Sequence, residues 1–169
     1  MNLYVIRHAD AGSREEWEGD DQDRPLSDLG RQQARALGEA FHRHGITIDA
    51  VFTSPYARAW QTAADFREAA QPDGKEPEPY HLLAPEVGKR RKLAKFLASV
   101  GVENVAIVGH DPDLPAFLAW LVGCEPENID LEKGGAACVR FDGDPQKHGG
   151  QLAWVVTPDW FMAGATAEV

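Results

Sequence analysis

The chain begins with the stretch "MNLYVIRHAD" (residues 1–10), in which a short apolar run ends abruptly in charge. The β-prone residues at positions 3 to 6 predict a buried strand over Leu3–Arg7. Arg7, His8 and Asp10 then place three ionisable groups at the tip of that strand. These groups are either solvated at the surface or part of a reactive site, and the rest of the sequence has to decide between the two interpretations.

Hydrophobic periodicity predicts five more strands and four helices along the chain. The strands are Ala50–Thr53, Pro79–Leu82, Val105–Val108, Ala136–Phe141 and Leu152–Thr157, and the helices are residues 27–44, 54–70, 86–100 and 114–122. The polar segments 11–25 and 71–79 are predicted to be surface loops. This order predicts an α/β fold, with residues 1–169 forming a single three-layer domain. Its central sheet is mostly parallel, with helices on both faces and an antiparallel strand pair at the C-terminal end.

Capping residues mark where the predicted helices begin and end. Ser27 and Ser54 are predicted N-caps of the first two helices, and Pro55 occupies the first position of the second, where its missing N–H costs nothing. Gly45 and Gly101 follow the first and third helices, and glycine is the residue that most often ends a helix.

Composition and charge narrow the possible functions. The chain has 169 residues and a formal net charge of −10, which argues against nucleic acid or an anionic membrane as a partner. No apolar run approaches the ~20 residues of a membrane span, and the early charges exclude a signal peptide, so a cytoplasmic location is expected. Cys124 and Cys138 form no disulfide framework or zinc spacing, and both are predicted to be buried, inert thiols.

The positions of four basic residues in the predicted sheet indicate where a functional site could lie. Arg7 and His8 end the first strand, Arg58 lies in the first turn after the second, and His110 follows the fourth. In an open parallel sheet, ligands bind beyond the carboxyl ends of the strands. Each residue alone has an ordinary explanation, as a hydrogen-bonded structural histidine or a solvated arginine. All four at one edge favour a reactive site.

The chemistry that these residue types suggest is phosphoryl transfer. Two arginines supply planar donors suited to phosphate oxygens, and the free amides of the second helix could add to them. A neutral imidazole at His8 is a competent nucleophile towards phosphorus, and the flanking cations disfavour its protonation. Neither a metal nor a cofactor is required if the arginines and His110 neutralise the phosphoryl charge.

Several motifs resemble the histidine phosphatase superfamily, whose signature is Arg-His-Gly after the first strand. The signature is present as "RHADA" (residues 7–11) with Ala9 in place of glycine, and "SPYARAWQTA" (54–63) and "VGHDP" (108–112) match two further blocks. Similarity to the short, SixA-like phosphohistidine phosphatases of this superfamily extends to "DRPLSDLGRQQA" (23–34), "KGGAACVRFD" (133–142) and "LAWVVTP" (152–158). The resemblance covers almost the whole chain.

The resemblance implies a role for each matching residue. His8 would accept the phosphoryl group, Arg7 and Arg58 would clamp it, and His110 would hydrogen-bond it in the transition state. Arg24 matches a further arginine at the pocket, although it is equally well interpreted as a surface residue capping the next helix. Ser54 is a further candidate for substrate binding.

The general acid of the superfamily has no clear counterpart. Glu86 and Asp10 are candidates, with Asp21 and Asp23 as rivals, and each is also consistent with a solvated surface carboxylate. An imidazole leaving group needs less help from an acid than an alkoxide does, and the short chain has no insertion that would build a lid. The sequence therefore predicts a metal-independent phosphatase with an open cleft, acting through phospho-His8 on phosphohistidine in a protein.

Two alternatives stay open. One is a phosphatase or mutase of small phosphorylated molecules. The other is a non-catalytic phosphate-binding module, whose support is that the Ala9 methyl group could crowd the incoming phosphate.

Overall fold

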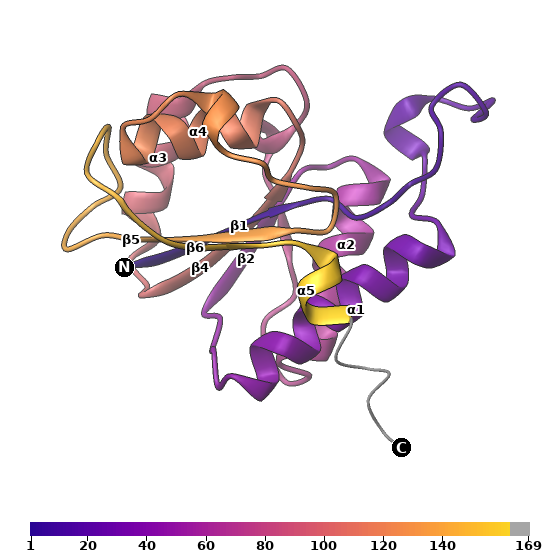
Figure 1. The fold of residues 1–169 in the computed structure, drawn as a ribbon, viewed down its shortest axis with the longest axis horizontal. Coiled ribbons are helices and arrows are strands. Elements are labelled where there is room, and N and C mark those ends of the chain that lie inside the picture. Colours follow the sequence, from indigo (N-terminus) through magenta and orange to yellow (C-terminus); the bar gives the residue numbers. More distant parts are fainter. Residues whose placement is uncertain (163–169) are drawn as a thin grey trace.

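A six-stranded sheet in the order β3-β2-β4-β1-β5-β6 forms the middle layer of the computed structural model, which describes residues 1–162. The strands are β1 (Asn2–Arg7), β2 (Ala50–Thr53), β3 (Glu78–Pro79), β4 (Asn104–Gly109), β5 (Ala136–Arg140) and β6 (Gln151–Val156). Strands β3, β2, β4 and β1 run parallel, whereas β5 is antiparallel to β1 and β6 to β5 (Figure 1). The predicted mostly parallel sheet with a C-terminal antiparallel pair is confirmed.

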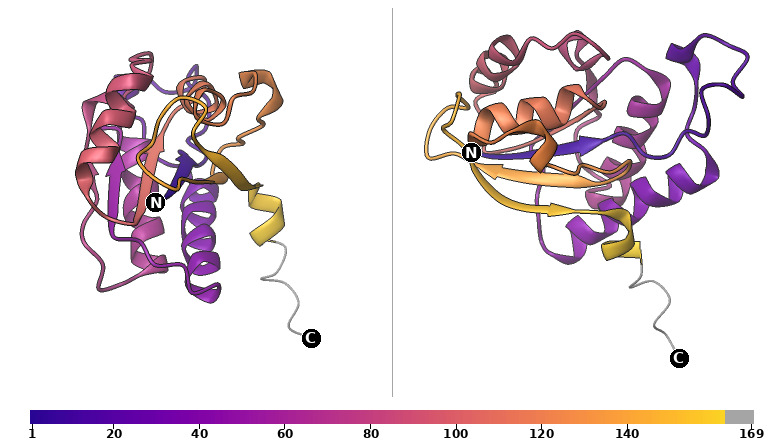
Figure 2. Two further views of the ribbon diagram at one scale, coloured as in Figure 1. Left: turned by 90° about the vertical axis from the view of Figure 1, so that its left-hand side faces the viewer. Right: turned by 45° about the horizontal axis from the view of Figure 1, so that its top comes forward.

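Helices cover both faces of the sheet (Figure 2). They are α1 (Asp28–Arg43), α2 (Ala57–Ala70), α3 (Arg90–Val100), α4 (Asp113–Val122) and the short α5 (Pro158–Met162), with the 3₁₀ turns η1 (Asp21–Asp23), η2 (His81–Leu83) and η3 (Pro126–Asn128). Helices α3 and α4 pack on one face, and α1, α2 and α5 pack on the other. No helix within residues 1–162 has the length and apolar character needed to span a bilayer.

The central strands are buried on both faces, so alternate residues serve two separate cores. Leu3 and Val5 of β1 belong to the core beneath α3 and α4, while Tyr4 and Ile6 belong to the core beneath α1 and α2. Strand β4 divides its side chains between the two cores in the same way. Because both strands are fixed from two sides, the residues at their carboxyl ends are held on a rigid base.

The start of α1 is tied to the loop that follows β1. Ser27 is the N-cap, as predicted, and its Oγ accepts a hydrogen bond from the Gly30 N–H at 3.0 Å. The Ser27 N–H in turn donates to the Asp10 carbonyl at 3.0 Å. A Cβ at Gly30 would lie 1.9 Å from that same carbonyl oxygen, so only glycine allows this approach.

Helices α2 and α3 begin later than predicted. Helix α2 starts at Ala57 with Tyr56 as its cap residue, so Ser54 is not the N-cap and Pro55 is not the first helical residue. Helix α3 starts at Arg90 rather than at residue 86, because Glu86 and Gly88 have left-handed backbones, with φ of 65° and 56°. Such a backbone interrupts a right-handed helix.

The third strand and the C-terminal end of the described chain also differ from the prediction. The strand predicted over Pro79–Leu82 is only Glu78–Pro79, because the chain turns into η2 directly after Tyr80. Helix α5 was not predicted, since five residues are too few to show periodicity. Cys138 is buried as expected, but Cys124 is exposed, because it follows the glycine that ends α4.

Candidate active site

Three neighbouring strands deliver the predicted residues to one edge of the sheet. Strand β1 ends at Arg7, directly before His8, and its parallel neighbour β4 ends just before His110. Strand β2 leads through Ser54 to Arg58 at the start of α2. The imidazole rings of His8 and His110 come to 5.0 Å between centroids. The two imidazoles therefore meet at this edge, and the charges of Arg58 and Arg7 are close enough to act on His8.

The His8 ring is oriented by its own backbone neighbour. Its Nδ1 lies 2.8 Å from the Ala9 carbonyl oxygen, which can only accept, so Nδ1 carries the proton and Nε2 carries the lone pair. The pKa of His8 is lowered to about 3, mainly by burial and then by the charges of Arg58 and Arg7, against the opposing effect of the Ala9 hydrogen bond. His8 is therefore a neutral imidazole at physiological pH, held in one tautomer. The flanking arginines disfavour protonation of His8 as expected, but burial is the larger cause of its lowered pKa.

His110 is positioned by Ser54. The His110 Nε2 and the Ser54 Oγ are 2.8 Å apart, and the same hydroxyl accepts the Tyr56 N–H at 3.2 Å. The ring of Tyr56 packs edge-on against His110, with 5.4 Å between centroids. The pKa of His110 is lowered to about 3, mainly by burial and then by His8 and Arg58. The buried Nδ1 of His110 has no partner among the described residues.

The two arginines are held by their outer nitrogens. Arg58 donates from Nη1 to the Asp21 carbonyl at 2.7 Å and from Nη2 to the Asp21 carboxylate at 3.0 Å, and its guanidinium lies 5.0 Å from the Tyr56 ring centroid. Arg7 donates from Nη1 to the Leu131 carbonyl at 3.0 Å, and its Nη2 lies 3.6 Å from Asp111. The buried Nε atoms of both arginines have no partner among residues 1–162. Each arginine thus keeps the N–H of its buried Nε without a partner among these residues, on a guanidinium whose orientation is fixed.

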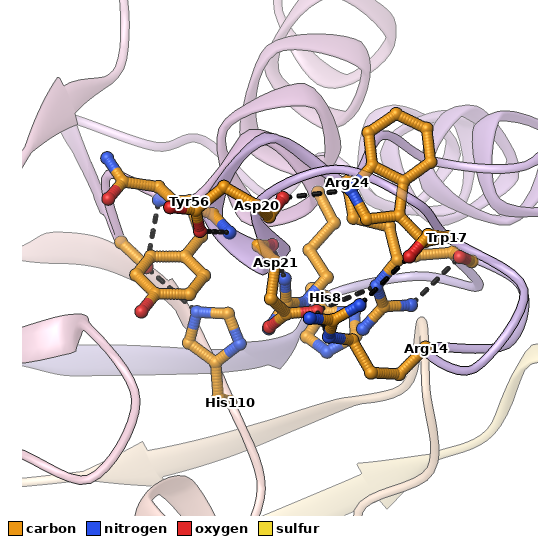
Figure 3. Close-up of polar contacts among 12 residues, drawn as sticks. His8, Arg14, Trp17, Asp20, Asp21, Arg24, Tyr56 and His110 are labelled. Carbon is orange, nitrogen blue, oxygen red and sulfur yellow. Dashed lines mark hydrogen bonds and ion pairs between the residues drawn. The ribbon is translucent and has the colours of Figure 1, made fainter.

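The loop after β1 folds back over this edge and brings Asp21 into the site (Figure 3). Arg24 donates from Nε to the Asp21 carboxylate at 2.9 Å and from Nη1 to the carbonyls of Ala11 and Gly12, at 2.9 and 3.1 Å. Arg14 adds an ion pair to Asp21 at 3.3 Å. Arg24 is therefore neither at the surface nor a cap of the following helix α1, whose N-cap is Ser27. It holds the loop together and secures the carboxylate that orients Arg58.

Asp21 is the residue whose role the sequence analysis missed. It appeared there as one of four candidate acids, whereas its carboxylate is bonded to two guanidiniums. Burial alone would raise the pKa of Asp21, but the hydrogen bond from Arg24 and the charge of Arg58 outweigh this effect and lower it. The spacing of three residues between Asp21 and Arg24 was the available signal, and it is too common on its own to be specific.

The other candidate acids lie in different surroundings. Asp10 accepts hydrogen bonds from the Ser27 hydroxyl at 2.6 Å and from the Gly12 N–H at 3.2 Å, and the Ser27 bond is the main reason that its pKa is lowered. The side chains of Glu86 and Asp23 are exposed, and Glu86 is fixed through its N–H, which donates to Asp113 at 2.6 Å. No described contact joins any of the three carboxylates to His8.

The site is more enclosed than the sequence analysis expected. His8, Arg58 and His110 are 7%, 5% and 3% exposed, so the predicted open cleft is not present in this conformation. The cover is the segment around Asp21, and its polar composition had suggested only a surface loop.

Ala9 faces away from the reactive edge. It is fully buried with Ala11, Leu26 and Ala34 beneath the loop, and its N–H donates to the Thr62 hydroxyl at 3.0 Å. The methyl group that replaces the usual glycine hydrogen therefore packs in an apolar cluster. This placement removes the observation on which the non-catalytic interpretation depended.

The site's free polar groups suit an anion better than a cation. They are guanidinium and imidazole nitrogens, and no cluster of three or more His, Cys, Asp or Glu side chains within residues 1–162 could hold a metal ion. Arginine forks and imidazoles are typical ligands of phosphate and similar oxyanions.

Comparison with known proteins agrees with this geometry. Residues 3–80 match the model of "Histidine phosphatase superfamily (branch 1)", a span that includes the His8 and Arg58 motifs. The chain belongs to the histidine phosphatase superfamily. The predicted family is thus confirmed.

Sequence relatives of the chain extend along its full length. An uncharacterised protein of Picosynechococcus is 30% identical over 96% of this chain and 99% of its own length. The phosphohistidine phosphatase SixA of Escherichia coli is 26% identical, covering 94% of both proteins.

Solved structures of other phosphatases share the fold. The protein histidine phosphatase SixA in complex with tungstate superposes with a TM-score of 0.81 at 24% identity, covering 94% of this chain and 97% of that one. A phosphoserine phosphatase of Entamoeba histolytica in complex with phosphoserine gives a TM-score of 0.68 at 15% identity, covering 93% and 97%. The same fold is therefore found in a protein histidine phosphatase and in a phosphoserine phosphatase.

Proposed function

We propose that the protein is a phosphatase that transfers a phosphoryl group to Nε2 of His8, and that its substrate is phosphohistidine on another protein. The observation that carries the proposal is the state of His8. It is a buried, neutral imidazole whose Nδ1 is occupied by the Ala9 carbonyl, beside two arginines and a second imidazole. A neutral nucleophile within a cationic, enclosed edge of the sheet is the arrangement that phosphoryl transfer requires.

Three free donors are available for the phosphoryl oxygens. The Nε atoms of Arg7 and Arg58 are fixed by the bonds that their outer nitrogens make, and they need no reorganisation before they bind. His110 completes the set if the Ser54 hydroxyl donates to its Nε2, because its unpartnered Nδ1 then carries the proton. Ser54 acts in this scheme through His110 rather than by touching substrate.

The reaction balances without an external acid in its first half. The Nε2 lone pair of His8 attacks phosphorus, and the P–N bond of the substrate breaks towards a protonated imidazole, which leaves as neutral histidine. Water then attacks the phosphorus of phospho-His8, the Nε2–P bond breaks back to a neutral ring, and orthophosphate leaves with the protons of the water. Both halves use the same ring in the same tautomer.

The state of the candidate general acids favours phosphohistidine over a phosphate ester as the substrate. An alkoxide leaving group must receive a proton, but Asp10 and Asp21 are held ionised by their hydrogen-bond partners. Glu86 is exposed on the loop before α3. A substrate whose leaving group already carries its proton avoids this difficulty. The kinship with SixA, a phosphohistidine phosphatase, agrees with this choice.

The enclosed site favours a second candidate, a phosphatase of small phosphate esters. A phosphohistidine on a protein reaches His8 only when the segment around Asp21 moves aside, whereas a small ester needs a smaller opening. The structural likeness to a phosphoserine phosphatase is consistent with this alternative. Turnover of a phosphohistidine peptide should be compared with that of phosphoserine. A higher kcat/KM for phosphoserine would select the second candidate.

Trapping the phosphoenzyme tests the proposed mechanism. A phosphohistidine peptide labelled with ³²P is mixed with the enzyme and quenched within milliseconds in alkaline detergent, because the P–N bond hydrolyses in acid. We expect label on the wild-type chain and none on His8→Ala, while His81→Ala, a change at an exposed histidine, labels normally. Label on the His8→Ala variant, or hydrolysis without a labelled wild-type enzyme, would refute the scheme.

Inhibition provides a further prediction. The arginines and His110 supply the positive charge in the proposed scheme, so EDTA should leave the rate unchanged. Orthovanadate, which adopts five-coordinate geometry, should inhibit by occupying the space between His8 and His110. Both effects are measured as initial rates with a phosphohistidine peptide. Loss of activity in EDTA that added metal restores would contradict the proposal.

A further inference from the structure

A concentrated group of cations lies at the start of α3. Lys89, Arg90, Arg91, Lys92 and Lys95, here called the basic rim, are five of the chain's 17 lysines and arginines, in a protein with a net charge of −10. All five side chains are exposed. Within residues 1–162, none of the five takes part in an ion pair.

The fold gives no reason for this concentration of charge. Helix α3 has no acidic residue in its first turn, and Lys89 at its N-cap makes no capping hydrogen bond. The N-terminal end of a helix is already electropositive, so cations there repel both the helix dipole and one another. The arrangement is therefore unfavourable for the isolated protein and becomes favourable when an anionic group binds.

The basic rim borders the candidate active site. Lys89 and Arg90, with Gly88, line a small cavity of about 20 Å³ that His110 and Asp113 also line. The same three residues continue into a surface hollow of about 410 Å³, which Arg91, Lys92 and Trp120 complete. The hollow and the reactive edge of the sheet thus share one wall.

The shape of the basic rim indicates which kind of anion it fits. A small ligand is bound by donors that converge and bury most of its surface, whereas these five cations are exposed along two turns of one segment. Glu86 and Asp113 are the acids beside the rim, and they leave an excess of positive charge. A net charge of −10 over the whole chain disfavours a membrane or a nucleic acid, both of which spread negative charge over large areas.

We propose that the basic rim docks an acidic segment of the protein whose phosphohistidine enters the site next to it. The inference rests on the proposed function and adds the class of partner, a phosphoprotein with acidic residues near its phosphohistidine. Attraction between the rim and such a segment would raise the encounter rate and orient the partner, even though most of this enzyme's surface repels acidic proteins.

Turnover of two phosphohistidine peptides tests the docking. The peptides differ only in their flanks, which are rich in glutamate in one and in serine and glycine in the other. We expect the wild-type kcat/KM to be about tenfold higher for the acidic peptide at low salt, with the ratio falling as NaCl is added. The ratio should approach one in Arg91→Gln/Lys92→Gln and stay at the wild-type value in Lys75→Gln/Lys147→Gln, which removes the same charge from exposed lysines elsewhere.

Binding without turnover separates this proposal from the proposed function. A fluorescent, unphosphorylated glutamate-rich peptide should bind the wild-type protein and the Lys75/Lys147 control, and bind more weakly to the Arg91/Lys92 variant. If this pattern holds but neither phosphopeptide is hydrolysed, the proposed function fails and the docking surface stands. If the peptide does not bind, if both variants weaken it equally, or if phosphatidylserine vesicles or RNA bind the rim in its place, the docking proposal is overturned.

Discussion

The residues of the reactive edge are mutually dependent, and Asp21 shows this most directly. Its carboxylate and carbonyl hold the outer nitrogens of Arg58, and Arg24 holds the same carboxylate. A guanidinium held through both outer nitrogens presents its Nε–H in one fixed direction. We therefore assign Asp21 a positioning role within the proposed mechanism.

Asp21→Asn should lower kcat/KM by about tenfold, because a neutral amide cannot hold both guanidiniums as the carboxylate does. Arg58→Ala, which removes the clamp itself, should cost on the order of 10²-fold. In a double-mutant cycle, Asp21→Asn should have little further effect once Arg58 is alanine. Asp23→Asn, at an exposed carboxylate in the same turn, is the matched control. Full additivity of the two losses would exclude a role for Asp21 through Arg58.

The buried imidazoles predict how stability depends on pH. The pKa of both His8 and His110 falls to about 3 in the folded chain, against an ordinary 6.5. Between pH 6.5 and 3 the unfolded chain therefore binds more protons than the folded chain, and the free energy of unfolding decreases as the pH falls. Urea midpoints at pH 7 and pH 5 should show this loss, and His8→Asn/His110→Asn should show a smaller one. Equal losses would mean that other groups control the acid sensitivity.

At the scale of elements, the attachment of α1 to the loop after β1 decides where His8 lies. The contact depends on Gly30, whose missing side chain lets the Asp10 carbonyl approach the first turn of the helix. Only Ala9 lies between Asp10 and the proposed nucleophile His8 along the chain. A substitution in the first turn of α1 should therefore alter the position of His8.

Gly30→Ala should destabilise the fold by about 1–3 kcal/mol and reduce activity, because its methyl group would displace the Asp10 backbone. The expected loss of stability is opposite to the usual effect, since alanine in place of glycine inside an exposed helix ordinarily stabilises a protein by about 1 kcal/mol. Gly143→Ala serves as the control, because no atom lies within 4 Å of the added carbon. Thermal unfolding and steady-state kinetics of both variants check the prediction. A more stable Gly30→Ala protein would show that the contact is not tight.

Elements with strong local signals could be predicted from the sequence, and short or context-dependent ones could not. The first helix has an apolar stripe, a serine cap and a terminal glycine, and its bounds are correct to a residue. The starts of α2 and α3 were placed too early. Ser54 bonds to His110 instead of capping, and the left-handed backbone at Glu86 arises from contacts distant in sequence. In the site, the four basic residues could be placed because they follow the ends of predicted strands. The contact of Asp21 with Arg58 could not be predicted, because the loop that carries Asp21 has no periodic sequence pattern.

At the scale of the whole molecule, one sheet joins two cores. Phe66 belongs to the core beneath α1 and α2, and Phe117 to the core beneath α3 and α4, and both are at most 1% exposed. The strands between them, β1 and β4, contribute to both cores, so neither layer can lose its packing alone. The two halves should unfold together.

Phe66→Ala and Phe117→Ala should each cost about 3–5 kcal/mol and shift a single urea transition to lower concentration. Circular dichroism and tryptophan fluorescence should give coincident curves for the wild-type protein and both variants. Leu29→Ala, at a side chain that is 49% exposed, should change stability by less than about 0.5 kcal/mol. Two separated transitions in either phenylalanine variant would show that the layers unfold independently.

The hydrogen bond from the His8 Nδ1 to the Ala9 carbonyl also fixes the chemical isomer of the proposed intermediate. A ring that donates from that nitrogen can carry phosphorus only on the distal one, so the trapped enzyme would be the tele form and never the pros form. Isomer-selective antibodies distinguish the two on a blot. The backbone of one alanine would thereby determine the regiochemistry of the phosphorylated enzyme.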